Sequence, residues 1–135
     1  MAVNAHRIKT DPDFYAPFLI AQAYRVGDLI FVSGQASIDE AGNIVAADDF
    51  DGQAEQAIAN LWRVLQAGGS DLSKLVKVTI YLTDMSHFPK IVELRRTHFT
   101  PPYPADTIVE VKALALPELQ IDIEAVALAD GEIVG

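Results

Sequence analysis

The sequence predicts an α+β fold in which two helices cover one face of a mixed β-sheet. Its 135 residues have the length of a single domain, and half of them are apolar, which is enough for one buried core. Along the chain, the hydrophobic patterns follow the order hairpin, helix, strand, helix and strand pair. We therefore expect one domain over residues 1–135, with residues 1–18 as an N-terminal extension or arm.

The first predicted unit is a β-hairpin in the segment AQAYRVGDLIFVSGQ. Two apolar runs flank Gly27 and Asp28, and a two-residue loop with glycine first is typical of a type II′ turn. The second run, residues 29–32, is continuously apolar, which predicts a strand covered on both faces. It ends in Ser33 and Gly34, where a glycine allows the backbone to bend or to be approached closely.

Two helices are predicted next. The first begins after a run of aspartates that can cap it, and Gly68-Gly69 ends it. The second is predicted to be capped by Ser86 and to run to about Phe99. The first helix carries an apolar stripe with a period of 3.6 residues, which is predicted to face the core and consists of Phe50, Ala54, Ala57, Ile58, Leu61, Trp62 and Leu65.

Three further strands are predicted. The segment KLVKVTIYLTD alternates, so Val76, Val78, Ile80 and Leu82 are expected on one face. Residues 107–116 and 119–128 are expected to form a strand pair joined around Pro117. Because both helices lie on one face, the other face is either solvated or buried against further copies of the chain; the apolar fraction of 50% favours a homo-oligomer.

Composition excludes several classes of function. The net charge of −9 and the lack of clustered Lys and Arg beyond Arg95-Arg96 make nucleic acid an unlikely partner. There is no cysteine, and the three histidines have no i,i+4 pair, so no metal site is predicted. No apolar run is long enough to span a membrane and no secretory signal is recognisable, so a cytoplasmic protein without membrane partners is expected.

The segment LQIDIEAVAL carries the most informative acids. Asp122 and Glu124 fall on one face of the last strand, with Ile121 and Ile123 opposite. One interpretation is a solvated strand face. The other is a paired-acid site in which one carboxyl group is held neutral and transfers a proton.

Residues 21–128 resemble the Rid family, also called YjgF/YER057c/UK114. The resemblance implies a chorismate-mutase-like fold of the bacillary type, a homotrimer whose sheets meet in a central barrel, and ligand clefts at the subunit interfaces. The residues that carry it, in matching order and spacing, are QAYRVGDLIFVSGQ, Gln53, Asn60-Leu61, LQAGGSDLSKLVKVTIYLTDM, Phe99, YPADT and IDIEAVA.

The resemblance also implies an activity: hydrolysis of reactive enamines and imines, such as 2-aminoacrylate, without metal or organic cofactor. Ser33 and Gly34 match residues that line the family's pocket. Asp122 occupies the position of a glutamate that positions or activates water, so it is the predicted catalytic residue, with Glu124 beside it. Ile20 and Val92 stand where a tyrosine and an asparagine are common in the family.

The departure with the largest consequence is Asp106. It stands where the resemblance places an arginine that grips the substrate carboxylate, so a predicted binding residue has the opposite charge. Arg96 lies one helical turn after Val92 and is expected either to supply the missing guanidinium, to pair with Asp106, or to be a solvated helix residue.

Three functions follow from these residues. The first is a Rid-family imine or enamine deaminase with altered substrate preference. The second is a non-catalytic trimer that binds a small metabolite or regulates a partner. The third is a ribonuclease, an activity also associated with the family, which the acidic charge disfavours.

Overall fold

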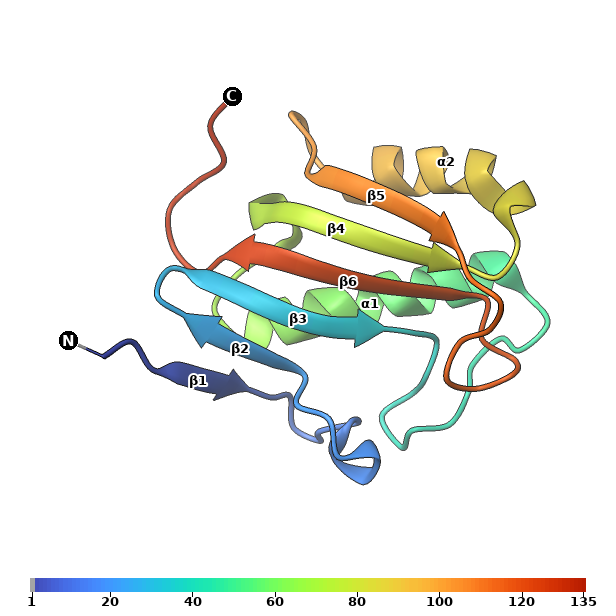
Figure 1. The fold of residues 1–135 in the computed structure, drawn as a ribbon, viewed down its shortest axis with the longest axis horizontal. Coiled ribbons are helices and arrows are strands. Elements are labelled where there is room, and N and C mark those ends of the chain that lie inside the picture. Colours follow the sequence, from blue (N-terminus) through green and yellow to red (C-terminus); the bar gives the residue numbers. More distant parts are fainter. Residues whose placement is uncertain (1) are drawn as a thin grey trace.

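The sheet has six strands in the order β1-β2-β3-β6-β4-β5 (Figure 1). The computed structural model describes residues 2–135. All neighbouring strands are antiparallel except β4 and β5, so the predicted mixed sheet is confirmed. The strands are β1 (Ala5–Ile8), β2 (Ala23–Val26), β3 (Leu29–Gln35), β4 (Leu75–Leu82), β5 (Ala105–Glu110) and β6 (Ile121–Leu128).

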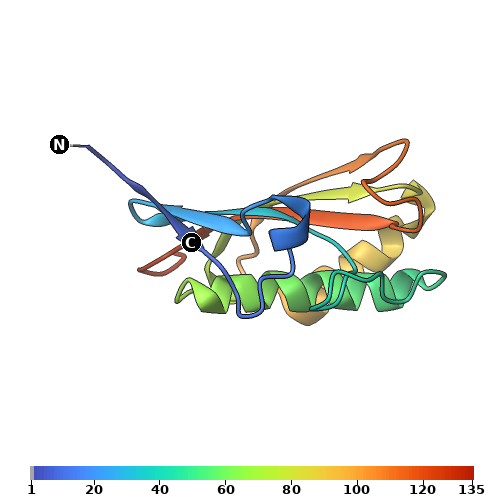
Figure 2. The ribbon, with the colours of Figure 1, turned by 90° about the horizontal axis from the view of Figure 1, so that it is seen from below.

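Both α-helices, α1 (Phe50–Ala67) and α2 (Phe88–His98), lie on the same side of the sheet, as predicted (Figure 2). Short 3₁₀ turns stand at Ala16–Phe18, Leu72–Lys74 and Met85–His87. The core lies between the helices and the sheet, where Leu61, Val78 and Ile123 are fully buried. No helix in residues 2–135 combines the length and apolarity that crossing a membrane requires.

The predicted hairpin is confirmed. Val26 pairs with Leu29 across a two-residue loop, and Gly27 has a φ of 58°, the left-handed conformation that favours glycine. The expectation that both faces of β3 are covered is wrong for the single chain. Ile30 and Val32 are buried, but Phe31 on the opposite face is 46% exposed, because the helices cover only one side of the sheet.

Two details of the helix predictions are wrong. Trp62 is 42% exposed, because the buried stripe of α1 centres on Ala57, Leu61 and Val64 and leaves Trp62 at its edge. Ser86 does not cap α2 with its side chain. Instead, Asp84 accepts a hydrogen bond from the Ser86 backbone N–H at the start of the preceding 3₁₀ turn.

The strand predictions need two corrections. The register of β4 against β6 shifts between Leu75 and Lys77, and Val76, 37% exposed at this irregularity, does not join the buried face of Val78 and Ile80. The last two strands are not a pair either. β4 lies between β5 and β6, because β4 is followed by the crossover helix α2, and a crossover connection returns the chain parallel to the strand it left.

β1 was not predicted. Ala5 to Ile8 pair antiparallel with β2 at the edge of the sheet, within the segment expected to be an N-terminal arm.

Candidate functional site

A largely apolar cleft of about 530 Å³ opens at the C-terminal end of β3. It brings together four of the six predicted site residues, Ser33, Gly34, Asp122 and Glu124. The other lining residues come from the segment around the first 3₁₀ turn, from the chain after β3 and from the loop before β6; they are Tyr15, Phe18, Ile20, Ala36, Ile38, Ala115, Leu116 and Leu119.

Ser33 and Gly34 lie in an irregularity of β3, where the pairing with β6 shifts between Val32 and Gln35. Ser33 Oγ donates a 2.6 Å hydrogen bond to the Ala21 carbonyl, and the Gln35 side-chain amide donates to the Ser33 carbonyl. The hydroxyl proton of Ser33 is therefore engaged with backbone. Its lone pairs remain as the serine's contribution to the cleft.

Gly34 makes room for Asp122. A Cβ added at Gly34 would lie far inside van der Waals contact with Oδ1 of Asp122. Only glycine therefore allows the carboxyl group to lie directly against the backbone of β3. The sequence suggested a close approach at this glycine, and the group that approaches is the predicted catalytic acid.

Asp122 is held in an environment that favours its protonated form. Burial, and to a smaller extent the charge of Glu124 on the same strand face, raise the pKa of Asp122 to about 6. The Ile123 backbone N–H opposes this shift. Oδ1 of Asp122 is buried and has no hydrogen-bond partner in the described residues. A carboxyl group with this pKa changes its charge near neutral pH, as a proton-transfer group must.

Two tyrosines flank the acids. Tyr81 donates a hydrogen bond to Glu124, which raises the pKa of the Tyr81 phenol. Tyr15 donates to the Gly34 carbonyl, and burial followed by the charge of Asp122 raises the pKa of the Tyr15 phenol. Sequence reasoning missed Tyr15, although the aromatic pair Phe14-Tyr15 inside a polar segment is a signal that this part of the arm packs on the domain.

Asp106 does not line the cleft of its own chain. It pairs with Val78 in the parallel β4–β5 register and so shares the helix-facing side of the sheet, whereas Asp122 points to the open side. Its Oδ2 accepts a hydrogen bond from Nε of Arg95 at 2.8 Å, in a half-buried ion pair. The carboxylate at this position is therefore neutralised from within the chain.

Arg96 is not the partner of Asp106, contrary to one of the alternatives in the sequence analysis. It forms an ion pair with Glu93 one turn earlier, and its side chain is 63% exposed. Neighbouring residues on a helix point about 100° apart, so only Arg95 of the two arginines reaches β5. Arg96 is thus a surface residue of this chain and lies outside the cleft.

Comparison with known proteins now identifies the family. The family model described as Endoribonuclease L-PSP matches residues 10–129. The RutC family protein y4sK of Sinorhizobium fredii is 47% identical over 107 residues, 78% of this chain and 83% of that protein. The 2-iminobutanoate/2-iminopropanoate deaminase of Mus musculus is 33% identical over 108 residues, 80% of this chain and 79% of the mouse protein.

A solved structure agrees with these relatives. RidA from an Antarctic Psychrobacter species has a TM-score of 0.84 and 31% sequence identity, and the match covers 91% of this chain and 98% of that one. The chain belongs to the Rid (YjgF/YER057c/UK114) family. The predicted family and fold are confirmed.

Buried side-chain amides hold the walls of the Rid cleft. Gln53 of α1 donates to the Glu118 carbonyl at 2.9 Å and accepts from the Gln120 N–H at 2.8 Å, which fixes the loop that carries Leu116 and Leu119. The same amide also donates to the carbonyls of residues 46 and 47. The position of this cleft wall therefore depends on one fully buried glutamine.

Asn60, two turns further along α1, does the same for the opposite wall. Its side-chain amide donates to the carbonyls of Ala36 and Ile38, both at 2.9 Å. Gln22 exchanges hydrogen bonds with Thr10 and so fixes the segment that leads to Tyr15. Gln53 and Asn60 thus link the helix layer to the irregular chain around the cleft, whereas Gln22 joins two non-helical segments to each other.

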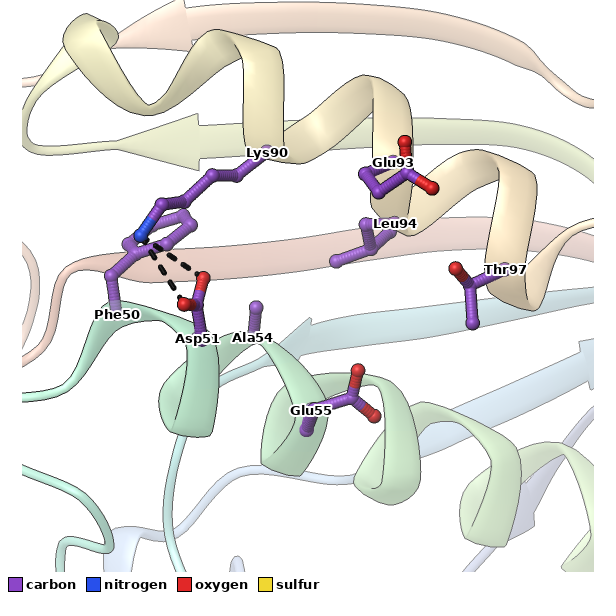
Figure 3. A pocket seen from close by; sticks show the side chains of 8 residues that line it. All are labelled: Phe50, Asp51, Ala54, Glu55, Lys90, Glu93, Leu94 and Thr97. Atoms are coloured by element: carbon purple, nitrogen blue, oxygen red, sulfur yellow. Dashed lines mark hydrogen bonds and ion pairs between the residues drawn. The ribbon is translucent and has the colours of Figure 1, made fainter.

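A second, open pocket lies between α1 and α2 (Figure 3). None of the predicted site residues lines it. Its one cation, Lys90, is paired with Asp51 across the groove at 3.2 Å, and Lys90 also lies over the ring of Phe50. We assign this pocket to helix–helix packing and not to the site.

Substitution of Gly34 by Ala is expected to displace the Asp122 carboxyl group. The added methyl collides with Oδ1, so the unfolding free energy should fall by about 1–3 kcal/mol in chemical denaturation, and any Asp122-dependent property should weaken. In an Asp122→Ala background the same substitution no longer meets a carboxyl group and should cost much less. Equal costs in the two backgrounds would show that the collision is relieved elsewhere.

The pKa of Asp122 predicts a pH dependence of stability. The unfolded value is about 3.9, so between about pH 4 and 6 the folded state binds more protons than the unfolded state, and stability falls as pH rises through this window. Asp122→Asn removes the effect. Relative to wild type, it should gain about 1–2 kcal/mol in urea unfolding between pH 4 and 7.5. The exposed Glu118→Gln is the control, and a gain that does not change with pH would contradict the assignment.

Proposed function

We propose that this Rid protein hydrolyses a reactive imine or enamine in clefts completed by neighbouring copies in a homotrimer, with a substrate preference altered at Asp106. The observation that carries the proposal is Asp122. It is a carboxyl group with a pKa of about 6, one oxygen of which is buried without a partner, at the side of an apolar cleft. Such a group can take a proton from water and return it to a leaving nitrogen.

The reaction balances with these groups alone. Ionised Asp122 accepts a proton from water as the water oxygen adds to the carbon of the protonated imine and the C=N π electrons pass to nitrogen. Protonated Asp122 then returns that proton to the nitrogen of the carbinolamine. The C–N bond breaks with its electron pair passing to nitrogen, the hydroxyl group loses its proton to the released ammonia, and the products are a carbonyl compound and ammonium. Two proton transfers by one group with a pKa near 6 are well matched at neutral pH.

Relatives support this class of reaction. The mouse relative is named for deamination of 2-iminobutanoate and 2-iminopropanoate, and a relative from Arabidopsis thaliana, 36% identical, is named Reactive Intermediate Deaminase A. Neither name establishes the substrate of this chain, in which an aspartate stands at the position expected for the carboxylate anchor.

The open face of the sheet supports a homotrimer. Tyr24 pairs with Phe31 and Phe31 with Val126 on this face, and both aromatic side chains are more than two-fifths exposed in the single chain. Burial against further copies would remove this apolar surface from water. A neighbouring copy would also be needed to bring Asp106 to a cleft, because Asp106 and Asp122 face opposite sides of their own sheet.

A non-catalytic trimer that binds a metabolite is the second candidate. It is favoured by the Asp106–Arg95 ion pair, because an engaged guanidinium is less available to a substrate carboxylate. Ribonuclease activity, which the description of the matching family model suggests, is disfavoured by the net charge of −9.

The proposed trimer predicts a mass of about three times 14.7 kDa in light scattering at micromolar concentration. Phe31→Glu places a charge on the open face and should shift the population toward monomer, whereas Trp62→Glu on the outer side of α1 should not. A wild-type protein that stays monomeric would remove the basis for an inter-subunit site.

The proposed hydrolysis predicts faster decay of imines made in situ. 2-Iminopropanoate, from alanine and an amino-acid oxidase, and benzaldimine, from benzylamine and an amine oxidase, provide an anionic and a carboxylate-free test. Micromolar protein should accelerate the hydrolysis of at least one of these imines. The rate is measured as the fall in the amount of semicarbazone that forms when semicarbazide traps the remaining imine. Asp122→Asn should reduce that rate about 100-fold or more, and Glu118→Gln should not. Background rates with both imines would favour the non-catalytic alternative.

A further inference from the structure

We propose that the cleft selects a small organic cation, an iminium ion or protonated amine with a hydrocarbon body and no carboxylate group. The part of this inference that concerns hydrolysis rests on the proposed function. The part that concerns binding depends only on the shape and charge of the cleft.

The walls of the cleft call for a hydrocarbon body. Phe18, Ile20, Leu116 and Leu119 line it from two separate segments, and its volume of about 530 Å³ lies in the range of sites that enclose small organic molecules. An apolar group of the ligand gains the free energy of leaving water only against such walls. A ligand that is polar over its whole surface would instead lose hydrogen bonds to water on entering the cleft.

The charges of the cleft call for a cation. Among the described residues that line it, the ionisable side chains are Asp122, Glu124 and Tyr15, and none is Lys, Arg or His. Arg95 of α2 is paired with Asp106 on the other side of the sheet. A ligand carboxylate would meet two acids without a counter-charge, while an ammonium or iminium group would be attracted by both.

The hydrogen bonds identify which acid meets the nitrogen. Glu124 already accepts a bond from Tyr81, and the Tyr15 hydroxyl is engaged with the Gly34 carbonyl. Oδ1 of Asp122 is buried and has no donor in residues 2–135. Asp122 lines the cleft and has no side-chain donor of its own among the described residues, so its carboxylate is the acid left to attract the N–H groups of a cationic ligand.

Cation binding and hydrolysis are chemically consistent. An iminium ion is a stronger electrophile than the neutral imine. Water adds to its carbon, the C=N electrons pass to nitrogen, and Asp122 takes the proton. Asp122 then returns the proton to the neutral amino group of the carbinolamine, and loss of ammonia leaves a protonated carbonyl that gives up its proton. The sum is R₂C=NH₂⁺ plus water giving R₂C=O and NH₄⁺, with no oxidant or reductant.

The test uses three ring compounds of similar size, benzylamine, benzyl alcohol and benzoate, and the ring-less methylamine. In calorimetric titrations of the full chain at pH 7.5, benzylamine should bind at least tenfold more tightly than benzyl alcohol. Benzoate should bind most weakly of the ring compounds, and methylamine should bind at least tenfold more weakly than benzylamine. Benzylamine should lose affinity as pH falls through about 6, where Asp122 becomes protonated.

Variants separate the two halves of the inference. Asp122→Asn should make the affinities for benzylamine and benzyl alcohol equal, and Glu118→Gln should leave the preference for benzylamine intact. Phe18→Ser should weaken the binding of all ring compounds without changing the order of their affinities. Benzoate binding as well as benzylamine, no benzylamine binding at millimolar concentration, or a preference that survives Asp122→Asn would overturn the inference. If the cleft prefers cations but neither imine is hydrolysed faster, the inference on cation binding holds and the proposed hydrolysis is rejected. If the hydrolysis of 2-iminopropanoate is accelerated and benzoate is the preferred ligand, the proposed hydrolysis holds and the inference on cation binding is rejected.

Discussion

The cleft depends on the need to satisfy backbone polar groups where the chain is buried but neither helical nor in a strand. Such groups cost free energy if they are left without partners, and around this cleft they belong to three loops. Side-chain amides on one rigid helix provide the partners: Gln53 binds the loop before β6, and Asn60 binds the chain after β3. α1 thus acts as the template that positions both walls, although no α1 side chain lines the cleft.

The acidic side of the cleft depends on how β3 and β6 fit together. β3 departs from regular pairing for two residues, and the departure places a glycine where the Asp122 carboxyl group needs space. Burial of the carboxyl group and the like charge of Glu124 both oppose its ionisation, and they outweigh the Ile123 backbone N–H, which favours it. A raised pKa is therefore a consequence of how β3 and β6 fit together, and it makes the group suitable for proton transfer without a metal or a second base.

Local patterns predicted local structure well, because their causes are local. Gly27 sets the hairpin turn, the 3.6-residue stripe sets α1, and the period of two places Asp122 and Glu124 on one face. The order of the strands in the sheet was harder to predict from the sequence. β5 and β6 have no local feature that separates them, and only tertiary pairing with β4 decides the sheet order. The sequence could not identify the partner of Asp106, because Arg95 and Arg96 are the same residue type. Their side chains point about 100° apart on the helix, and only that of Arg95 reaches Asp106.

The Asp106–Arg95 pair changes how the altered anchor position should be understood. An isolated carboxylate there would repel anionic ligands, but Asp106 is held by a guanidinium at 2.8 Å, so β5 presents a nearly neutral ion pair to its surroundings. In the proposed trimer this pair would approach a neighbouring cleft without strongly attracting or repelling a ligand carboxylate. The two acids of β6 would then dominate the local field, and the charge preference of the site would be decided by Asp122 more than by the substitution at position 106.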